Sequence, residues 1–136
     1  HLLRTSRIIN NEIVKGLHRH GFTELSSPHT ALLSNLDLDG SSLTLVAQRA
    51  GMTKQAMGRL ADELIELNYI ERSKSVTDKR AIKLTFTSIG MKLMECSFSV
   101  MEEIELRCAK RIGDSHLNTL LSSLQKIVDE FEKTTT

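Results

Sequence analysis

The feature that most constrains this chain is the spacing of three residues near its middle. Ala47 is followed four residues later by Gly51, and Met57 comes six residues after that glycine. Two helices that cross closely need a small residue at the crossing, a residue that accepts positive φ in the turn, and an apolar side chain between them. The spacing therefore predicts a helix-turn-helix, with one helix over 43–50 and a second over 53–68.

The second of these helices has one apolar and one polar face. Met57, Leu60, Ala61 and Leu64 recur at helical spacing and form the apolar face. In a helix-turn-helix the second helix enters the major groove of DNA, where Gln suits adenine and Arg or Lys suits guanine. Polar residues in its first turns, and a threonine that opens the preceding helix, are therefore predicted to bind DNA. They are Lys54, Gln55 and Arg59 on bases, Thr53 and Thr44 on phosphates, and Gly58 on the same face.

Directly after this helix the hydrophobic pattern changes from the period of a helix to that of strands. Residues 69–72 and 82–86 alternate apolar with polar side chains, and a polar stretch over 73–80 separates them. This pattern predicts a β-hairpin with an exposed tip. Without the hairpin, an ordinary solvated face would be the favoured interpretation of the helix, but the hairpin is rich in basic residues that suit phosphates. Those expected to bind DNA are Arg72, Lys74, Lys79 and Arg80.

Charge is unevenly distributed along the chain. The net charge is +1, yet residues 43–85 carry eight basic and five acidic side chains, which favours a polyanionic partner. No apolar run approaches the ~20 residues that span a bilayer, and residues 1–20 lack the pattern of a secretion signal. We therefore expect a cytoplasmic protein with no membrane partner. Because the chain begins with His1, a few native residues are expected to precede it.

Helices are predicted on both sides of this central region. Apolar residues at helical spacing indicate a helix over 2–20, a short helix that begins at Pro28, a long one over 88–112, and a last one over 114–131. A turn over 37–42 ends the short helix. The predicted fold is mainly helical with a small β-hairpin, a winged helix-turn-helix flanked by helices, in a single domain.

The first and last helices carry apolar stripes that a monomer of 136 residues would leave largely uncovered. One alternative is that these helices pack only on each other within one chain. A homodimer is favoured, because two-fold symmetry also matches paired DNA half-sites one helical turn, ~34 Å, apart. The residues expected at the interface are Leu2, Leu3, Ile9, Leu117, Leu121, Leu124, Val128 and Phe131.

The chain resembles the MarR family of bacterial regulators. The likeness rests on the segments LTLVAQRAG, TKQAMGR and LADELIELNYIER between residues 43 and 72, and above all on DKR at 78–80, followed by LT at 84–85 and by Gly90. Asn68 departs from the glycine that is frequent there, although Asn also tolerates the left-handed conformation. In the order and length of the helices the resemblance extends to the whole chain.

The resemblance implies a sequence-specific regulator of bacteria or archaea, associated with the nucleoid. It implies a homodimer, typically a repressor on a palindromic operator, with residues 22–87 as the winged core and 1–21 and 88–136 as dimerisation helices. Asp78 would hold the wing in shape, and Arg80 would enter the minor groove or pair with Asp78. A small aromatic or phenolic effector is also implied, but the sequence does not locate its site.

Other functions find less support in the residues. Cys96 and Cys108 invite the alternative of a redox-sensing regulator, but both fall on or beside the apolar face of one predicted helix, ~18 Å apart, so packing cysteines are favoured. The histidines lack a metal-ligand spacing, and no motif indicates an enzyme or a cofactor. A winged helix that binds protein instead of DNA is a further alternative, against which Lys54, Gln55 and Arg59 argue.

Overall fold

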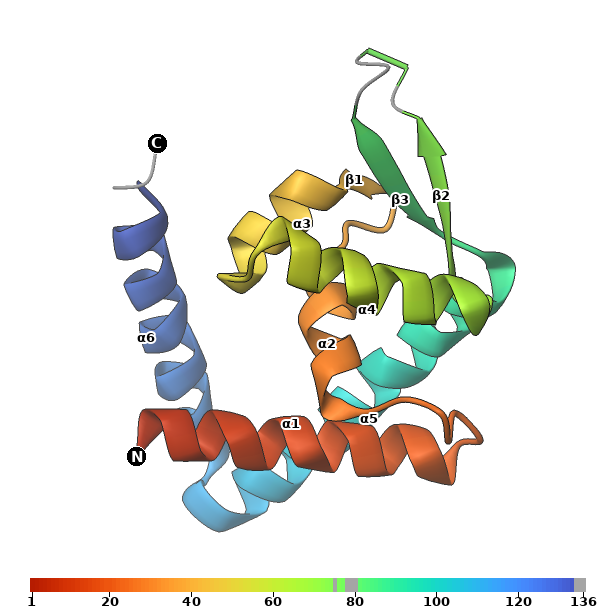
Figure 1. The fold of residues 1–136 in the computed structure, drawn as a ribbon. Coiled ribbons are helices and arrows are strands. Elements are labelled where there is room, and N and C mark those ends of the chain that lie inside the picture. The colour runs from red at the N-terminus through yellow and green to blue at the C-terminus, as the bar shows by residue number, and fades with distance from the viewer. Residues whose placement is uncertain (75, 78–80, 134–136) are drawn as a thin grey trace. The chain divides into compact units, whose positions relative to one another are not determined.

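The computed structural model describes residues 1–74, 76–77 and 81–133, which are drawn in colour in Figure 1. The chain forms two compact units, residues 1–100 and 101–136. The fold is mainly helical with one small antiparallel sheet, which confirms the predicted fold class. In chain order the elements are α1 (Leu2–Arg19), α2 (Ser27–Leu33), β1 (Ser41–Ser42), α3 (Leu43–Ala50), α4 (Lys54–Glu66), β2 (Ile70–Lys74), β3 (Ile82–Phe86), α5 (Ser88–Ile112) and α6 (Asp114–Lys133).

The predicted helix-turn-helix is present as α3 and α4. Ala47 is buried, and Met57 is completely buried in the core that the two helices share. Gly51 ends α3 in the left-handed conformation with a φ of 64°, which costs a glycine little. The other three predicted apolar positions of α4 join Met57 in the core. The pattern read from the sequence therefore identified both the turn and the buried face.

Both ends of α4 follow from local sequence. Thr53 caps its start, because its hydroxyl oxygen accepts a hydrogen bond from the backbone N–H of Ala56 at 3.1 Å. Beyond the last turn Asn68 adopts a φ of 67°, and the N–H of Tyr69 donates to the carbonyl oxygen of Leu64 at 3.0 Å. Asn68 thus serves as the left-handed residue that ends the helix and redirects the chain into β2.

The hairpin after α4 belongs to a three-stranded sheet. β2 and β3 pair antiparallel with Arg72 opposite Leu84, and the order of the strands is β1–β3–β2. The sequence predicted a plain turn over 37–42, which was wrong for Ser41 and Ser42, since these form β1. Two serines carry no strand pattern of their own. They form a strand because Ser41 pairs with Leu84, a partner far along the chain.

α2 is shorter than predicted and stands between α1 and the α3–α4 pair (Figure 1). It ends at Leu33, although the apolar pattern extends to about residue 37. The side-chain amide of Asn35 donates to the carbonyl oxygen of Ala31 at 2.8 Å. Such side-chain bonds to the backbone compete with continuation of a helix.

Two glycines in the first unit are required by close packing. A Cβ at Gly16 of α1 would overlap the side chain of Val100 on α5, so the glycine lets these helices approach. A Cβ at Gly90, near the start of α5, would overlap the backbone carbonyl oxygen of Tyr69. The close approach to Tyr69 therefore explains why the sequence motif has a glycine at position 90.

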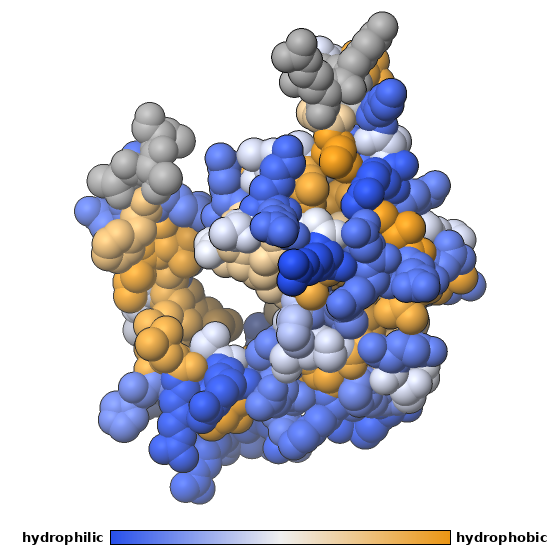
Figure 2. All heavy atoms as spheres, in the orientation of Figure 1, coloured by the Kyte–Doolittle hydropathy of each residue, from blue (hydrophilic) through white to orange (hydrophobic). Residues whose placement is uncertain are grey.

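The second unit consists of the end of α5 and of α6. No described residue of α6 is buried, and apolar side chains gather along this helix, orange in Figure 2. An amphipathic helix of 20 residues that leaves most of its apolar face exposed needs a partner surface. The exposed large apolar residues of the unit are Met101, Leu106, Ile112, Leu120, Leu121, Ile127, Val128 and Phe131.

Candidate nucleic-acid interface

The first turns of α4 present polar side chains to solvent. Lys54, Gln55 and Arg59 are all exposed. Lys54 and Gln55 occupy the first two helical positions after the capping residue Thr53. Backbone N–H groups of a first helical turn lack intrahelical acceptors and favour anions nearby. The start of α4 therefore combines a site that favours phosphate with side chains that can donate to base edges.

The start of α3 offers further hydroxyl groups. Ser42 caps α3, and its hydroxyl oxygen accepts a hydrogen bond from the N–H of Leu45 at 3.1 Å. Thr44 is exposed in the first turn of the same helix. A hydroxyl beside a helix start suits a phosphate oxygen, which is the role that the sequence predicts for Thr44.

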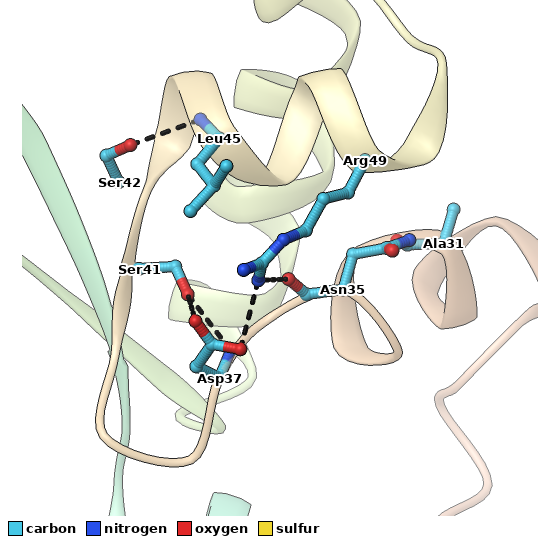
Figure 3. Close-up of polar contacts among 7 residues, drawn as sticks. All are labelled: Ala31, Asn35, Asp37, Ser41, Ser42, Leu45 and Arg49. Atoms are coloured by element: carbon cyan, nitrogen blue, oxygen red, sulfur yellow. Dashed lines mark hydrogen bonds and ion pairs between the residues drawn. The ribbon is translucent and has the colours of Figure 1, made fainter. Parts of the chain in front are cut away.

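A polar network fixes the connection from α2 into α3 (Figure 3). Nη1 of Arg49 donates to a carboxylate oxygen of Asp37 and to the backbone carbonyl of Asn35, each at 3.0 Å. The hydroxyl of Ser41 donates to the other carboxylate oxygen of Asp37 at 3.0 Å. The hydrogen bond from Arg49, followed by that from Ser41, holds the pKa of Asp37 below its ordinary value. The network thus ties α3 and β1 to the loop that follows α2.

The hairpin carries the remaining predicted DNA contacts. Lys74 is exposed at the end of β2. Arg72 is tied back to α4, since its Nη2 lies 2.6 Å from Oδ1 of Asp62. The sequence assigned Arg72 to DNA and did not predict this partner within the chain. The other predicted residues of the wing, Asp78, Lys79 and Arg80, lie outside the described residues.

Gly58 lies on α4 between the exposed residues Gln55 and Arg59 and has no side chain. It is half-buried, and a Cβ there would meet only Cδ2 of Leu43, at the ordinary van der Waals distance of 4.0 Å. A glycine inside a helix costs ~0.5–1 kcal/mol relative to alanine. The internal packing of the described residues therefore gives no reason for a glycine at this position.

A contact between α2 and α4 was not predicted. His29 is buried, and its Nε2 lies 2.7 Å from Oε2 of Glu63. The other ring nitrogen, Nδ1, accepts a hydrogen bond from the backbone N–H of Ser26 at 3.1 Å. The spacing of Ser26 and His29 is that of a capping box, whose last position is usually Glu or Gln. That spacing was the one signal in the sequence that His29 faces the backbone.

Comparison with known families finds a match to the central part of the chain. Residues 23–81, which contain α2, α3, α4 and β2, match the model of the MarR family. Over this segment the chain is similar to the MarR family. No curated protein matches the chain.

Solved structures share the fold of nearly the whole chain. A MarR transcriptional regulator from Methanosarcina mazei has a TM-score of 0.80 at 19% identity, over 95% of this chain and 91% of its own. CouR from Rhodococcus jostii, bound to p-coumaroyl-CoA, has a TM-score of 0.72 at 22% identity, over 93% and 87%. A mutant of S. aureus MepR, bound to an oligodeoxyribonucleotide, has 0.63 at 19% identity, over 96% and 95%. The fold is that of MarR-family transcriptional regulators, as the sequence predicts.

Few groups suited to chemical sensing occur among the described residues of the chain. Cys96 and Cys108 are partly buried on α5. Nε2 of His18 lies 2.6 Å from the carbonyl oxygen of Leu25. Within the described part of the chain, no group of three His, Cys, Asp or Glu side chains is placed to hold a metal ion. No helix there is long and apolar enough to cross a membrane.

Proposed function

We propose that this chain is a homodimeric transcriptional repressor that binds a palindromic operator and is released by a small-molecule effector. The observation that carries the proposal is the exposed start of α4, where Lys54, Gln55 and Arg59 stand in the first two turns. In a helix-turn-helix, this part of the second helix meets base edges in the major groove. MepR, a structure of similar fold, is bound to an oligodeoxyribonucleotide, which supports the same use of the fold here.

Two copies are proposed to join through their first and last helices. Phe131 on α6 is 70% exposed, and Leu3 on α1 is 86% exposed. Removing apolar surface from water is favourable by ~25 cal/mol per Å², so pairing such helices would drive association. A two-fold axis would then place two copies of α4 in successive major grooves, ~34 Å apart. Of the other predicted interface residues, Leu2, Leu121 and Val128 are exposed, and Ile9, Leu117 and Leu124 are half-buried.

The effector is proposed to be a small aromatic or phenolic compound. CouR has a similar fold and was solved with p-coumaroyl-CoA, which supports a ligand of this class. A ligand shifts only an equilibrium between states that it binds unequally. It would therefore release DNA by favouring a dimer whose two α4 helices are not spaced for adjacent major grooves. Titration of phenolic acids into the protein–DNA complex tests this, and an affinity for DNA that no such compound lowers would contradict it.

Selection of DNA from a randomised duplex pool tests the leading proposal. We expect the protein to recover an inverted repeat and to bind it with an affinity that falls steeply with salt, with a log–log slope of about −0.9 per phosphate contact. Lys54→Ala and Arg59→Ala should weaken this binding. Lys92→Ala, which removes an exposed positive charge from α5, is the matched control. The proposal would be contradicted if the selection enriched no particular DNA sequence, or if the affinity for DNA did not change with salt.

The dimer is tested separately by light scattering. Leu121→Glu combined with Val128→Glu places two charges on the apolar face of α6 and should leave a folded monomer. Ser122→Glu is the control, because it adds a charge to an exposed polar position of the same helix. A wild-type protein that is monomeric at micromolar concentration would overturn the proposed assembly.

A further inference from the structure

The recognition helix α4 is attached to α2 through one buried histidine. The side chain of His29 is 7% exposed, and its Nε2 lies 2.7 Å from Oε2 of Glu63. Since Nδ1 accepts the N–H of Ser26, the ring proton sits on Nε2 and is donated to the Glu63 carboxylate. The two ring nitrogens therefore join the start of α2 to the side of α4.

α2 is itself anchored on its other side. The hydroxyl of Thr30 donates to Oδ1 of Asn10 at 2.8 Å, and the hydroxyl of Ser27 donates to Oδ1 of Asn11 at 3.0 Å. Both acceptors lie on α1. His29 therefore connects α4 to a helix that α1 already holds in place. Because α2 is fixed, the contact between His29 and Glu63 can restrain α4.

An ion pair holds α4 from another element. Asp62 adjoins Glu63 in the sequence and is bound by Arg72 of β2 at 2.6 Å. Successive side chains of a helix point about 100° apart around its axis. The two acidic residues therefore reach different neighbours, α2 and the hairpin, and rotation of α4 about its axis would stretch at least one of the two contacts.

We propose that His29 is a positioning residue for DNA reading, which sets the rotation of α4 by holding Glu63. The inference rests on the proposed DNA-binding function. A rotation of about 20° would move atoms at the helix surface, ~6 Å from the axis, by ~2 Å. Hydrogen bonds to base edges tolerate a few tenths of an ångström. A modest rotation would therefore misplace Gln55 and Arg59 on the bases and leave the fold intact.

Replacement of Glu63 tests the inference without disturbing the cap of α2. The measurement is the ratio of affinities for the duplex that the wild type selects and for a scrambled duplex, at one salt concentration. Glu66→Ala is the matched control, because Glu66 is exposed on the same helix and its loss removes the same charge. Both variants should bind scrambled DNA more tightly, but only Glu63→Ala should lower the ratio, by about fivefold or more, the effect of losing one base contact.

Two variants of His29 show whether its hydrogen bonds to Ser26 and Glu63 matter for DNA reading, or only the space that its side chain fills. His29→Gln should keep the wild-type ratio, because the Gln oxygen can accept the N–H of Ser26 and its amide can donate to Glu63. His29→Leu can do neither and should lower the ratio as Glu63→Ala does, with no further loss when the two changes are combined. If His29→Leu does not fold, the comparison of Glu63→Ala with Glu66→Ala still decides.

Equal ratios for Glu63→Ala and Glu66→Ala would overturn the positioning role and leave DNA binding untouched. A ratio that falls for His29→Gln as far as for Glu63→Ala would overturn it as well. A wild-type protein that selects no sequence would instead refute the proposed function itself. The two failures are therefore distinguishable.

Discussion

Replacing Gly58 by alanine tests whether the surface beside the start of α4 meets DNA. Gly58 lies inside α4, and the added methyl group would contact only Cδ2 of Leu43, at 4.0 Å. Because this site has room, the change should yield the difference in helix propensity between glycine and alanine. We therefore expect the free energy of unfolding to rise by about 0.5–1 kcal/mol.

The same methyl group should weaken DNA binding. It projects from the helix beside the exposed residues proposed to read bases, so it would stand where the DNA surface approaches. Greater stability together with lower DNA affinity cannot arise from damage to the fold. Urea unfolding is measured at a fixed protein concentration, since the stability of a dimer depends on concentration. DNA affinity is measured by fluorescence anisotropy on the selected duplex.

Gln48→Ala, at an exposed position of α3, is the control helix substitution and should change both quantities little. A fall in the unfolding free energy of Gly58→Ala would show that the methyl group has no room. A more stable variant with unchanged DNA affinity would refute the placement of DNA against this side of α4.

Gly90→Ala should lower the free energy of unfolding by ~2–3 kcal/mol, because the new Cβ overlaps the backbone carbonyl of Tyr69, which cannot rotate away. Urea unfolding measures this change, and an unchanged stability would contradict the close approach of Gly90 to that carbonyl. Gly16→Ala should also destabilise, by ~1–3 kcal/mol, but less in a Val100→Ala background, where the overlapping side chain is gone; additive effects in this double-mutant cycle would count against direct contact. The pKa of Asp37 is lowered in the folded state, so its contribution to stability is present above the ordinary carboxyl pKa of 3.8 and is lost as pH falls through the folded value. Asp37→Asn should therefore lose less unfolding free energy than the wild type between pH 5 and pH 3, and identical pH profiles would show that the network does not bind the carboxylate.

The parts of the fold that the sequence predicted are those set by neighbouring residues. Thr53 caps α4 and Asn68 ends it by bonds within the same few residues. Ala47, Gly51 and Met57 act within one helix pair. Each of these residues has a side-chain property that suits one local geometry, so the sequence pattern was enough to place them.

The parts that the sequence missed depend on partners far along the chain. Ser41 becomes a strand residue only because Leu84 pairs with it. His29 finds Glu63 across 34 positions, and no pattern marks that pair in advance. Arg72 was recognised as a basic residue suited to phosphate, but its charge is already partnered by Asp62. The guanidinium has five N–H donors, so the pair with Asp62 leaves donors for the phosphate contact that the sequence predicts for Arg72.

Apolar and polar contacts contribute differently to the rotation of α4 about its own axis. Burial of its apolar face is non-directional, so hydrophobic contacts hold the helix against the core but tolerate some turning about its axis. Hydrogen bonds are directional and lose strength within a few tenths of an ångström. The contacts that set the rotation of α4 are therefore expected among its polar pairs, Glu63 with His29 and Asp62 with Arg72. The pair of Asp62 with Arg72 is exposed, and exposed ion pairs add little to stability, so substitutions there should alter which DNA sequence is bound more than how stably the chain folds.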